Sequence, residues 1–283
     1  MTEEQPPTTN GANAAAHNAA AMARVLAGIQ LLHTRLDALE GITPRTAAEG
    51  DRPSLPRRQL PAWRLPSNGE ARWQVTLCTA LAIALQLPIH GRLSLVHPDW
   101  VLPAVQGLLL VGLVTANPRR INRESKALRS LALGLAGLLS VVNAYAAGML
   151  VLEIVQGKAP STAGPLLATG ASIWLTNVVV FALWYWEFDQ GGPVARALAT
   201  QRRYPDFLFA NMTIADNPDL CQKDWRPAFG DYLYLSFTNA TAFSPTDTLP
   251  LSRWAKMAMT LQSVVSLVTV ALVVARAVNI LPS

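Results

Sequence analysis

Long runs of apolar residues after residue 72 constrain the fold of this chain more than any other feature. A helix needs about 20 residues to cross the ~30 Å hydrocarbon core of a bilayer. Five runs approach or exceed that length, and we predict a spanning helix for each: Trp73–Ile89, Val101–Ala116, Ala127–Val155, Gly164–Trp186 and Ala255–Val278. We therefore expect an all-α membrane protein with about five transmembrane helices.

The composition agrees with this class of protein. The 283 residues are 51% hydrophobic and 14% charged, whereas about 25% of residues are charged in typical soluble domains. The sequence pI of 9.6 arises from arginines in the loops between the predicted spans rather than from a surface that binds nucleic acid. The first twenty residues contain Glu3 and Glu4 and lack the apolar run of a cleavable signal peptide. We expect a multi-pass protein of the plasma (inner) membrane, with the lipid bilayer as a partner and no nucleic acid.

The polar N-terminal part contains one periodic segment. Its apolar residues recur at steps of three and four, which is typical of an amphipathic or coiled-coil helix. Those residues are Met22, Val25, Ile29, Leu32, Leu36 and Leu39. The Pro/Arg-rich stretch that follows either contacts anionic lipid head groups or stays solvated. We divide the chain into a disordered segment (1–21), a helix (22–40), a Pro/Arg-rich linker (41–72), a three-span membrane region (73–163) and a two-span module (164–283).

A short polar segment stands directly before the last predicted span. Asp231–Phe243 has about 13 residues, too few to cross a bilayer as a helix. Asp231 is suited to cap a helix that starts at Tyr232, and Pro245 ends that helix. Non-helical backbone at membrane depth is tolerated only where protein or a water-filled cavity surrounds it. We therefore predict a re-entrant half-helix.

This segment resembles the pore helix, selectivity filter and inner helix of tetrameric potassium channels. The family pattern YFSFVTLTTVGYGDIVP aligns without a gap with YLSFTNATAFSPTDTLP, residues 234–250. The identical positions are Tyr234, Ser236, Phe237, Thr241, Asp247 and Pro250. Gly164–Trp186 then stands in the place of the outer helix and Ala255–Val278 in that of the inner helix. The segment is also similar to an uncharacterised bacterial membrane family, domain of unknown function 1345, whose motif reads FAFTIGMTFQVSDT.

The resemblance implies a pore module without a potassium filter. The filter letters TVGYGD fall on residues 242–247, where Ser244, Pro245 and Thr246 replace both glycines and the tyrosine. Glycines permit the backbone angles that aim carbonyls at the ion, whereas proline fixes φ and removes an N–H group. We therefore expect no ladder of carbonyl sites. The predicted pore-loop residues are Thr238, Asn239, Thr241, Ala242, Phe243, Ser244, Pro245, Thr246 and Asp247.

Two functions of this loop remain open. In the homotetramer that the resemblance implies, oxygens of Thr238, Asn239 and Thr241 would lie near the axis, and Asp247 would form a carboxylate ring that favours monovalent cations. The result is a weakly selective cation path. Alternatively, the loop is a closed cap, and the protein is a non-conducting scaffold or sensor that acts through its N-terminal helix and the 187–230 loop.

Charge in the loops predicts the orientation. The loop Asn117–Arg129 carries five cations, and the positive-inside rule places it in the cytoplasm together with residues 1–72. Two predicted spans separate this loop from the re-entrant segment, which we therefore expect on the same side. In potassium channels the equivalent loop faces outward, whereas ionotropic glutamate receptors contain the module in inverted orientation.

The few polar residues inside the predicted spans have a structural explanation. Asn143, Asn177 and Gln262 could support transport, but we expect them to form hydrogen bonds between helices. Glu153, Glu187 and Asp189 fall at span ends, where we expect them to reach water.

No catalytic residue, metal ligand or cofactor is predicted, and we do not expect an enzyme. A metal site would have to use the loop residues His90, His97 and Asp99. A membrane enzyme would have to use these residues together with Asp206, Asp216 and Asp219.

Overall fold

The computed structural model describes residues 22, 26–28, 30, 61–89, 93–116, 120–121, 125–160, 162–199, 204–214, 222–241 and 247–280. The chain divides into two units, residues 1–59 and 60–283. In the first unit the described positions, Met22, residues 26–28 and Gln30, are helical and exposed. The rest of the predicted 22–40 helix, the 1–21 segment and the first part of the 41–72 linker lie outside the described residues.

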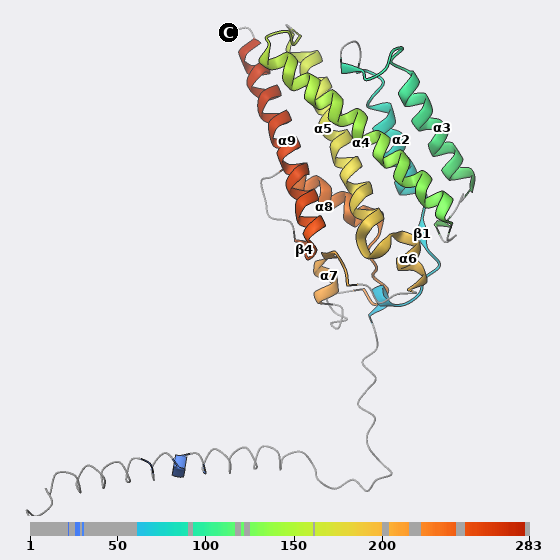
Figure 1. Ribbon diagram of the computed structural model, residues 1–283, viewed down its shortest axis with the longest axis vertical. Coiled ribbons are helices and arrows are strands. Elements are labelled where there is room, and N and C mark those ends of the chain that lie inside the picture. The colour runs from blue at the N-terminus through green and yellow to red at the C-terminus, as the bar shows by residue number, and fades with distance from the viewer. Residues whose placement is uncertain are drawn as a thin grey trace, which may run out of the picture. The chain divides into compact units, whose positions relative to one another are not determined.

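The second unit is a bundle of long helices that run side by side (Figure 1). Its main helices are α2 (Trp73–Ala84), α3 (Val101–Ala116), α4 (Lys126–Val155), α5 (Ala163–Phe188), α8 (Phe229–Thr241) and α9 (Arg253–Ile280). Short helices are η1 (Ala62–Arg64), η3 (Asp189–Gly191), α6 (Pro193–Leu198) and α7 (Ala210–Thr213). The prediction of an all-α fold is therefore confirmed.

Among the described residues, three helical stretches are long and apolar enough to cross a membrane: Lys126–Val155, the stretch Ala163–Leu198 that contains α5, and Arg253–Ile280. Helix α3 has the predicted bounds but only 16 residues, about 24 Å at 1.5 Å per residue. Helix α2 was predicted to reach Ile89 but ends after 12 residues, at Ala84. The chain turns there because Pro88 follows and disfavours helix just before it. The count of five spans stays a prediction.

Two short antiparallel strand pairs hold one end of the bundle together. Strand β1 (Glu70–Ala71) pairs with β2 (Arg120–Ile121), which brings the start of α2 next to the loop before α4. Strand β3 (Phe207–Leu208) pairs with β4 (Leu249–Pro250), just before α9. The indole of Trp186 at the end of α5 donates to Glu70 (2.7 Å) and so joins α5 to β1. We call this the strand end and the opposite end the distal end.

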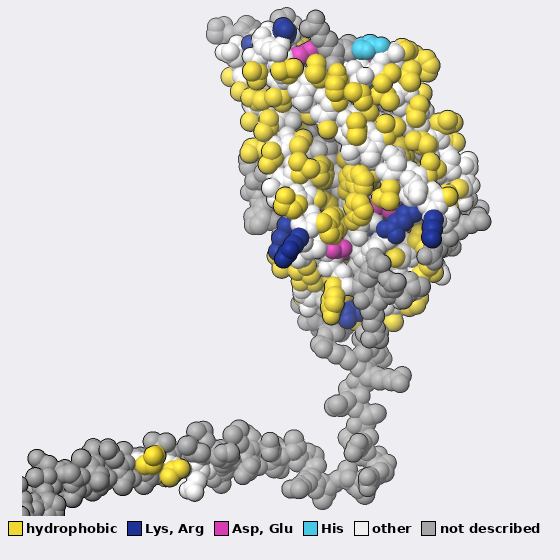
Figure 2. All heavy atoms as spheres, in the orientation of Figure 1, with side chains coloured by type: hydrophobic (Ala, Val, Ile, Leu, Met, Phe, Trp, Pro, Cys, Tyr) yellow, Lys and Arg dark blue, Asp and Glu magenta, His cyan; other side chains and the backbone are white. Residues whose placement is uncertain are grey.

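The strand end therefore brings together Glu70–Ala71 and Arg120–Ile121, which belong to segments that charge counting predicted on one side of the membrane. Figure 2 shows Lys and Arg side chains clustering toward this end, below a face covered mostly by hydrophobic side chains. Helix α9 exposes apolar side chains along its length, including Met257, Leu261, Leu267 and Val278. A helix that is apolar on all sides is typical of a lipid environment or of a buried position.

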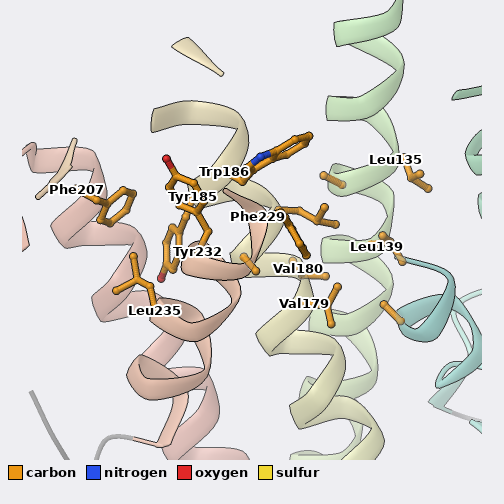
Figure 3. Close-up of a cluster of buried hydrophobic side chains, with 14 of the residues drawn as sticks. Leu135, Leu139, Val179, Val180, Tyr185, Trp186, Phe207, Phe229, Tyr232 and Leu235 are labelled. Atoms are coloured by element: carbon orange, nitrogen blue, oxygen red, sulfur yellow. The ribbon is translucent and has the colours of Figure 1, made fainter. Parts of the chain in front are cut away.

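The core is richest in aromatic side chains near the strand end. Tyr185, Phe207, Phe229 and Tyr232 are almost completely buried there. Phe207 lies beside Tyr185 and Tyr232, whereas Phe229 lies on the side of Trp186 (Figure 3), whose ring is 5.8 Å from its own. The rings of Phe207 and Tyr185 lie 5.1 Å apart. A second cluster, built mainly from Leu, Ile and Ala, fills the bundle toward the distal end. The aromatic cluster fixes α8 against the end of α5.

Candidate functional site

Helix α8 is the short helix that the sequence predicts before the last span. It starts at Phe229, so the prediction of a start at Tyr232 with Asp231 as the cap is wrong. Asp231 is instead the third residue of the helix, and its carboxylate accepts the backbone N–H of Ala228 at 2.8 Å. This bond satisfies one of the free N–H groups at a helix start. Burial raises the pKa of Asp231, and the bond from Ala228 opposes that shift.

Helix α8 reaches only part of the way along its neighbours α5 and α9 (Figure 1). Its Ser236 hydroxyl donates to the carbonyl of Val178 (2.6 Å), ten residues before the end of α5 at Phe188, or about 15 Å along a helix. By Leu249–Pro250 the chain is back at the strand end, where it pairs with β3. The segment thus enters the bundle and leaves it at the same end.

A buried hydrogen-bonded group, which we call the polar seam, joins α5, α8 and α9. It consists of Tyr185, Ser236, Asn239, Gln262 and Ser263. The Gln262 side chain is at its centre and has no exposed surface. Its Oε1 accepts from the Tyr185 hydroxyl (2.7 Å) and from Asn239 Nδ2 (2.8 Å). Its Nε2 donates to the carbonyl (2.9 Å) and hydroxyl (2.7 Å) of Ser236.

The predicted helix–helix role of the polar residues is confirmed at two positions. Gln262 bridges three helices through the polar seam, and Asn177 Nδ2 on α5 donates to the Ser266 hydroxyl on α9 (3.0 Å). Asn143 on α4 is buried, but its Oδ1 has no hydrogen-bond partner in the part of the chain that the structure describes. Buried polar groups in apolar surroundings are costly unless they are paired, so the satisfied amides fix the position of α8.

The predicted pore-loop residues on α8 direct their hydrogen bonds into their own chain. The hydroxyls of Thr238 and Thr241 donate to backbone carbonyls of α8 itself. Asn239 Nδ2 also donates to the Met259 carbonyl of α9 (2.9 Å), and its Oδ1 accepts from the Ser263 hydroxyl (3.2 Å). Asp247 is exposed, and the Tyr234 hydroxyl lies 3.5 Å from its Oδ2. Ala242, Phe243, Ser244, Pro245 and Thr246 lie outside the described residues.

The turn after α5 places an arginine beneath the end of that helix. Gly191 and Gly192 both have positive φ, +87° and +99°, and a Cβ on Gly192 would lie 2.9 Å from the Glu187 carbonyl oxygen. Only glycine fits this turn without strain. Pro193 then starts α6, where its fixed φ suits the first helical position. Arg196 follows one turn later.

Arg196 is the centre of a buried ion-paired cluster at the strand end. Its guanidinium contacts the Glu70 carboxylate at 3.0 Å, and only 7% of the Arg196 side chain is exposed. The same guanidinium donates to the carbonyls of Trp186 (2.8 Å) and Asp189 (2.9 Å). It therefore ties β1 to the end of α5.

Two carboxylates extend this cluster to α8 and α9. Asp189 accepts from the Tyr232 hydroxyl on α8 (2.6 Å) and from the backbone N–H of Asp206 (2.7 Å). Asp206 in turn accepts from the Trp254 indole on α9 (2.8 Å). The prediction that Glu187 and Asp189 reach water is wrong, because their exposed fractions are 6% and 0%. Asp189 pairs with Tyr232 and Asp206, which lie 43 and 17 residues away in the sequence, and the signal for this cluster in the sequence was the dense stretch WYWEFDQGGP, residues 184–193.

Metal ligands do not converge in the part of the chain that is described, where no group of three or more His, Cys, Asp or Glu side chains is placed to hold an ion. His97 Nε2 and Asp99 Oδ1 lie 3.6 Å apart in the loop before α3, whereas His90 and the acids at 216 and 219 lie outside the described residues. No family model matches the chain, and no curated protein or solved structure matches it either.

Proposed function

We propose that the chain is an integral membrane protein in which α5, α8 and α9 form a channel-like pore module. Helix α8 would be a re-entrant half-helix that opens to the strand end. One observation supports this proposal most: α8 stops part-way along two full-length helices, and the chain returns to the end from which it came. Such a segment suits a bilayer because neighbouring helices surround it and satisfy its polar groups.

The proposed activity is a weakly selective path for monovalent cations in an oligomer, with four copies as the expected number. Asp247 is exposed at the strand end, so that several copies would place a ring of carboxylates at the mouth. The C-terminal end of α8 carries partial negative charge, which also favours cations. Tyr234 and Phe237 of α8 are exposed and offer a surface for the neighbouring copy. Ser244, Pro245 and Thr246 replace the residues that a potassium filter needs, so we propose no potassium selectivity.

The test is ion flux in liposomes that contain the purified full-length oligomer. We expect flux of monovalent cations, and we expect Asp247→Asn to shift the reversal potential in a salt gradient toward zero. Asp224→Asn is the matched control, because Asp224 is also exposed and the charge change is the same. Intact tetramers that pass no monovalent ion would rule out the cation path.

The polar seam favours a second candidate, a non-conducting membrane scaffold or sensor. Asn239 and Thr241 form their hydrogen bonds within the chain, which would hold α8 as a fixed plug. The N-terminal helix and the 187–230 loop would then bind a partner. This candidate predicts no flux together with capture of a partner that is lost when residues 1–45 are removed. Capture that is independent of those residues would count against it.

A further inference from the structure

A cavity of about 290 Å³ lies between α2, α3, α4 and α5 at the strand end, apart from the polar seam. Its walls are mainly apolar, with Leu110 and Leu113 from α3, Leu135 from α4 and Leu183 from α5. Its lining also includes the first turn of α4, whose free backbone N–H groups favour an anion. The cavity thus combines an apolar wall with a polar end, as an amphiphilic ligand requires.

The residues that line the cavity carry a net positive charge. Arg72, Lys126 and Arg129 line it together with a single carboxylate, Glu187, so three cations face one anion. Glu187 is buried and lies within electrostatic range of both arginines. Lys126 and Arg129 are exposed, so the excess positive charge is open to a ligand and attracts an anion to the cavity.

Arg72 also has an unused donor. Its Nε is buried and has no hydrogen-bond partner among the described residues. Burial lowers the pKa of Arg72, and the Glu187 carboxylate opposes that shift. A buried donor without a partner is costly, and an anionic oxygen in the cavity would pair with it.

We propose that this cavity binds an acidic phospholipid. Arg72, Lys126 and Arg129 hold the phosphate of the head group, and part of one acyl chain lies along the leucines. This inference rests on the proposed membrane location, where the strand end lies at the cytoplasmic surface. Basic pockets between membrane helices on that side commonly bind acidic head groups. A zwitterionic lipid brings no net charge for the excess positive charge to attract.

The experiment measures lipid binding by the full-length protein in detergent, without any ion flux. Micelles are doped with phosphatidylglycerol or phosphatidylcholine, or inorganic phosphate is added, and the thermal unfolding midpoint and lipid retention in native mass spectrometry are recorded. We expect phosphatidylglycerol to raise the midpoint and to be retained. In Arg72→Gln/Arg129→Gln we expect roughly thirtyfold weaker binding, because each cation near the membrane surface contributes roughly five- to sixfold in affinity.

Two further variants separate the cavity from general charge. Arg253→Gln/Lys256→Gln removes the same charge from exposed positions on α9 and is expected to bind normally. Ala132→Phe fills the cavity and keeps every charge, so it is expected to lose retention even if the double arginine variant does not fold. Equal effects of phosphatidylcholine, an equal effect of inorganic phosphate alone, or normal binding by both cavity variants would overturn the proposal. Retained phosphatidylglycerol without ion flux would refute the cation path and leave this site intact.

Discussion

Replacing Gln262 by leucine is expected to loosen α8 from the bundle. The change removes four hydrogen bonds, two accepted and two donated, to Tyr185, Asn239 and Ser236. Inter-helix hydrogen bonds in membranes average about 0.6 kcal/mol each, and a buried hydroxyl left without its acceptor costs about 1–3 kcal/mol. These terms overlap, since Tyr185 enters both, so we expect a loss of roughly 2–3 kcal/mol.

The assay is reversible unfolding in mixed micelles titrated with dodecyl sulfate. Gln106→Leu is the matched control, because Gln106 on α3 is equally buried and its side-chain amide has no partner among the described residues. Removing an unpaired amide relieves a desolvation penalty, so the control is expected to be neutral or stabilising. In a double-mutant cycle, Gln262→Leu and Tyr185→Phe are expected to show a coupling energy of about 1 kcal/mol. The polar seam would not hold α8 in place if the Gln262→Leu and Gln106→Leu variants were equally stable. The same conclusion would follow if the effects of Gln262→Leu and Tyr185→Phe added to within ~0.5 kcal/mol.

Two further predictions concern packing and charge in the same bundle. A Cβ on Gly170 would lie 2.8 Å from Val273 Cγ1, so Gly170→Ala is expected to lower the free energy of unfolding by about 1–3 kcal/mol. Adding Val273→Ala should restore most of that stability. A double variant as unstable as Gly170→Ala alone would contradict this explanation. Arg196→Met leaves the Glu70 carboxylate without its cation and is expected to lower the free energy of unfolding by about 3–5 kcal/mol. Adding Glu70→Gln should restore part of that stability. An unchanged free energy of unfolding in Arg196→Met would show that the ion pair does not stabilise the bundle.

The apolar runs were sufficient to predict the long helices. Helix α3 has the predicted bounds, and α9 differs from its prediction by two residues at each end, because continuous apolar sequence has few alternatives to helix. Helix α2 ends at Ala84 instead of Ile89. Pro88 predicts this earlier end, but the prediction considered only the length of the apolar run.

The candidate site was less accessible to sequence reasoning because its contacts join distant segments. Asn239 and Gln262 carry no sign that they bond to each other, and spacing alone cannot tell an amide that faces a pore from one that faces the next helix. The burial of Asp189 depends likewise on Tyr232, 43 residues away. Strands β1 and β2 place Glu70–Ala71 and Arg120–Ile121 at one end of the bundle, and the side of the membrane that this end faces stays a prediction.

Cysteine accessibility on the two sides of α8 tests the central claim most directly. Single cysteines replace Asp224 before the helix, Asp247 after it and Lys158 at the distal end, in a background that lacks Cys78 and Cys221. Intact cells are treated with a membrane-impermeant maleimide before and after permeabilisation. We predict that positions 224 and 247 react only after permeabilisation, whereas position 158 reacts in intact cells. Labelling of 224 and 247 from opposite sides would show that α8 crosses the membrane and would contradict the re-entrant half-helix.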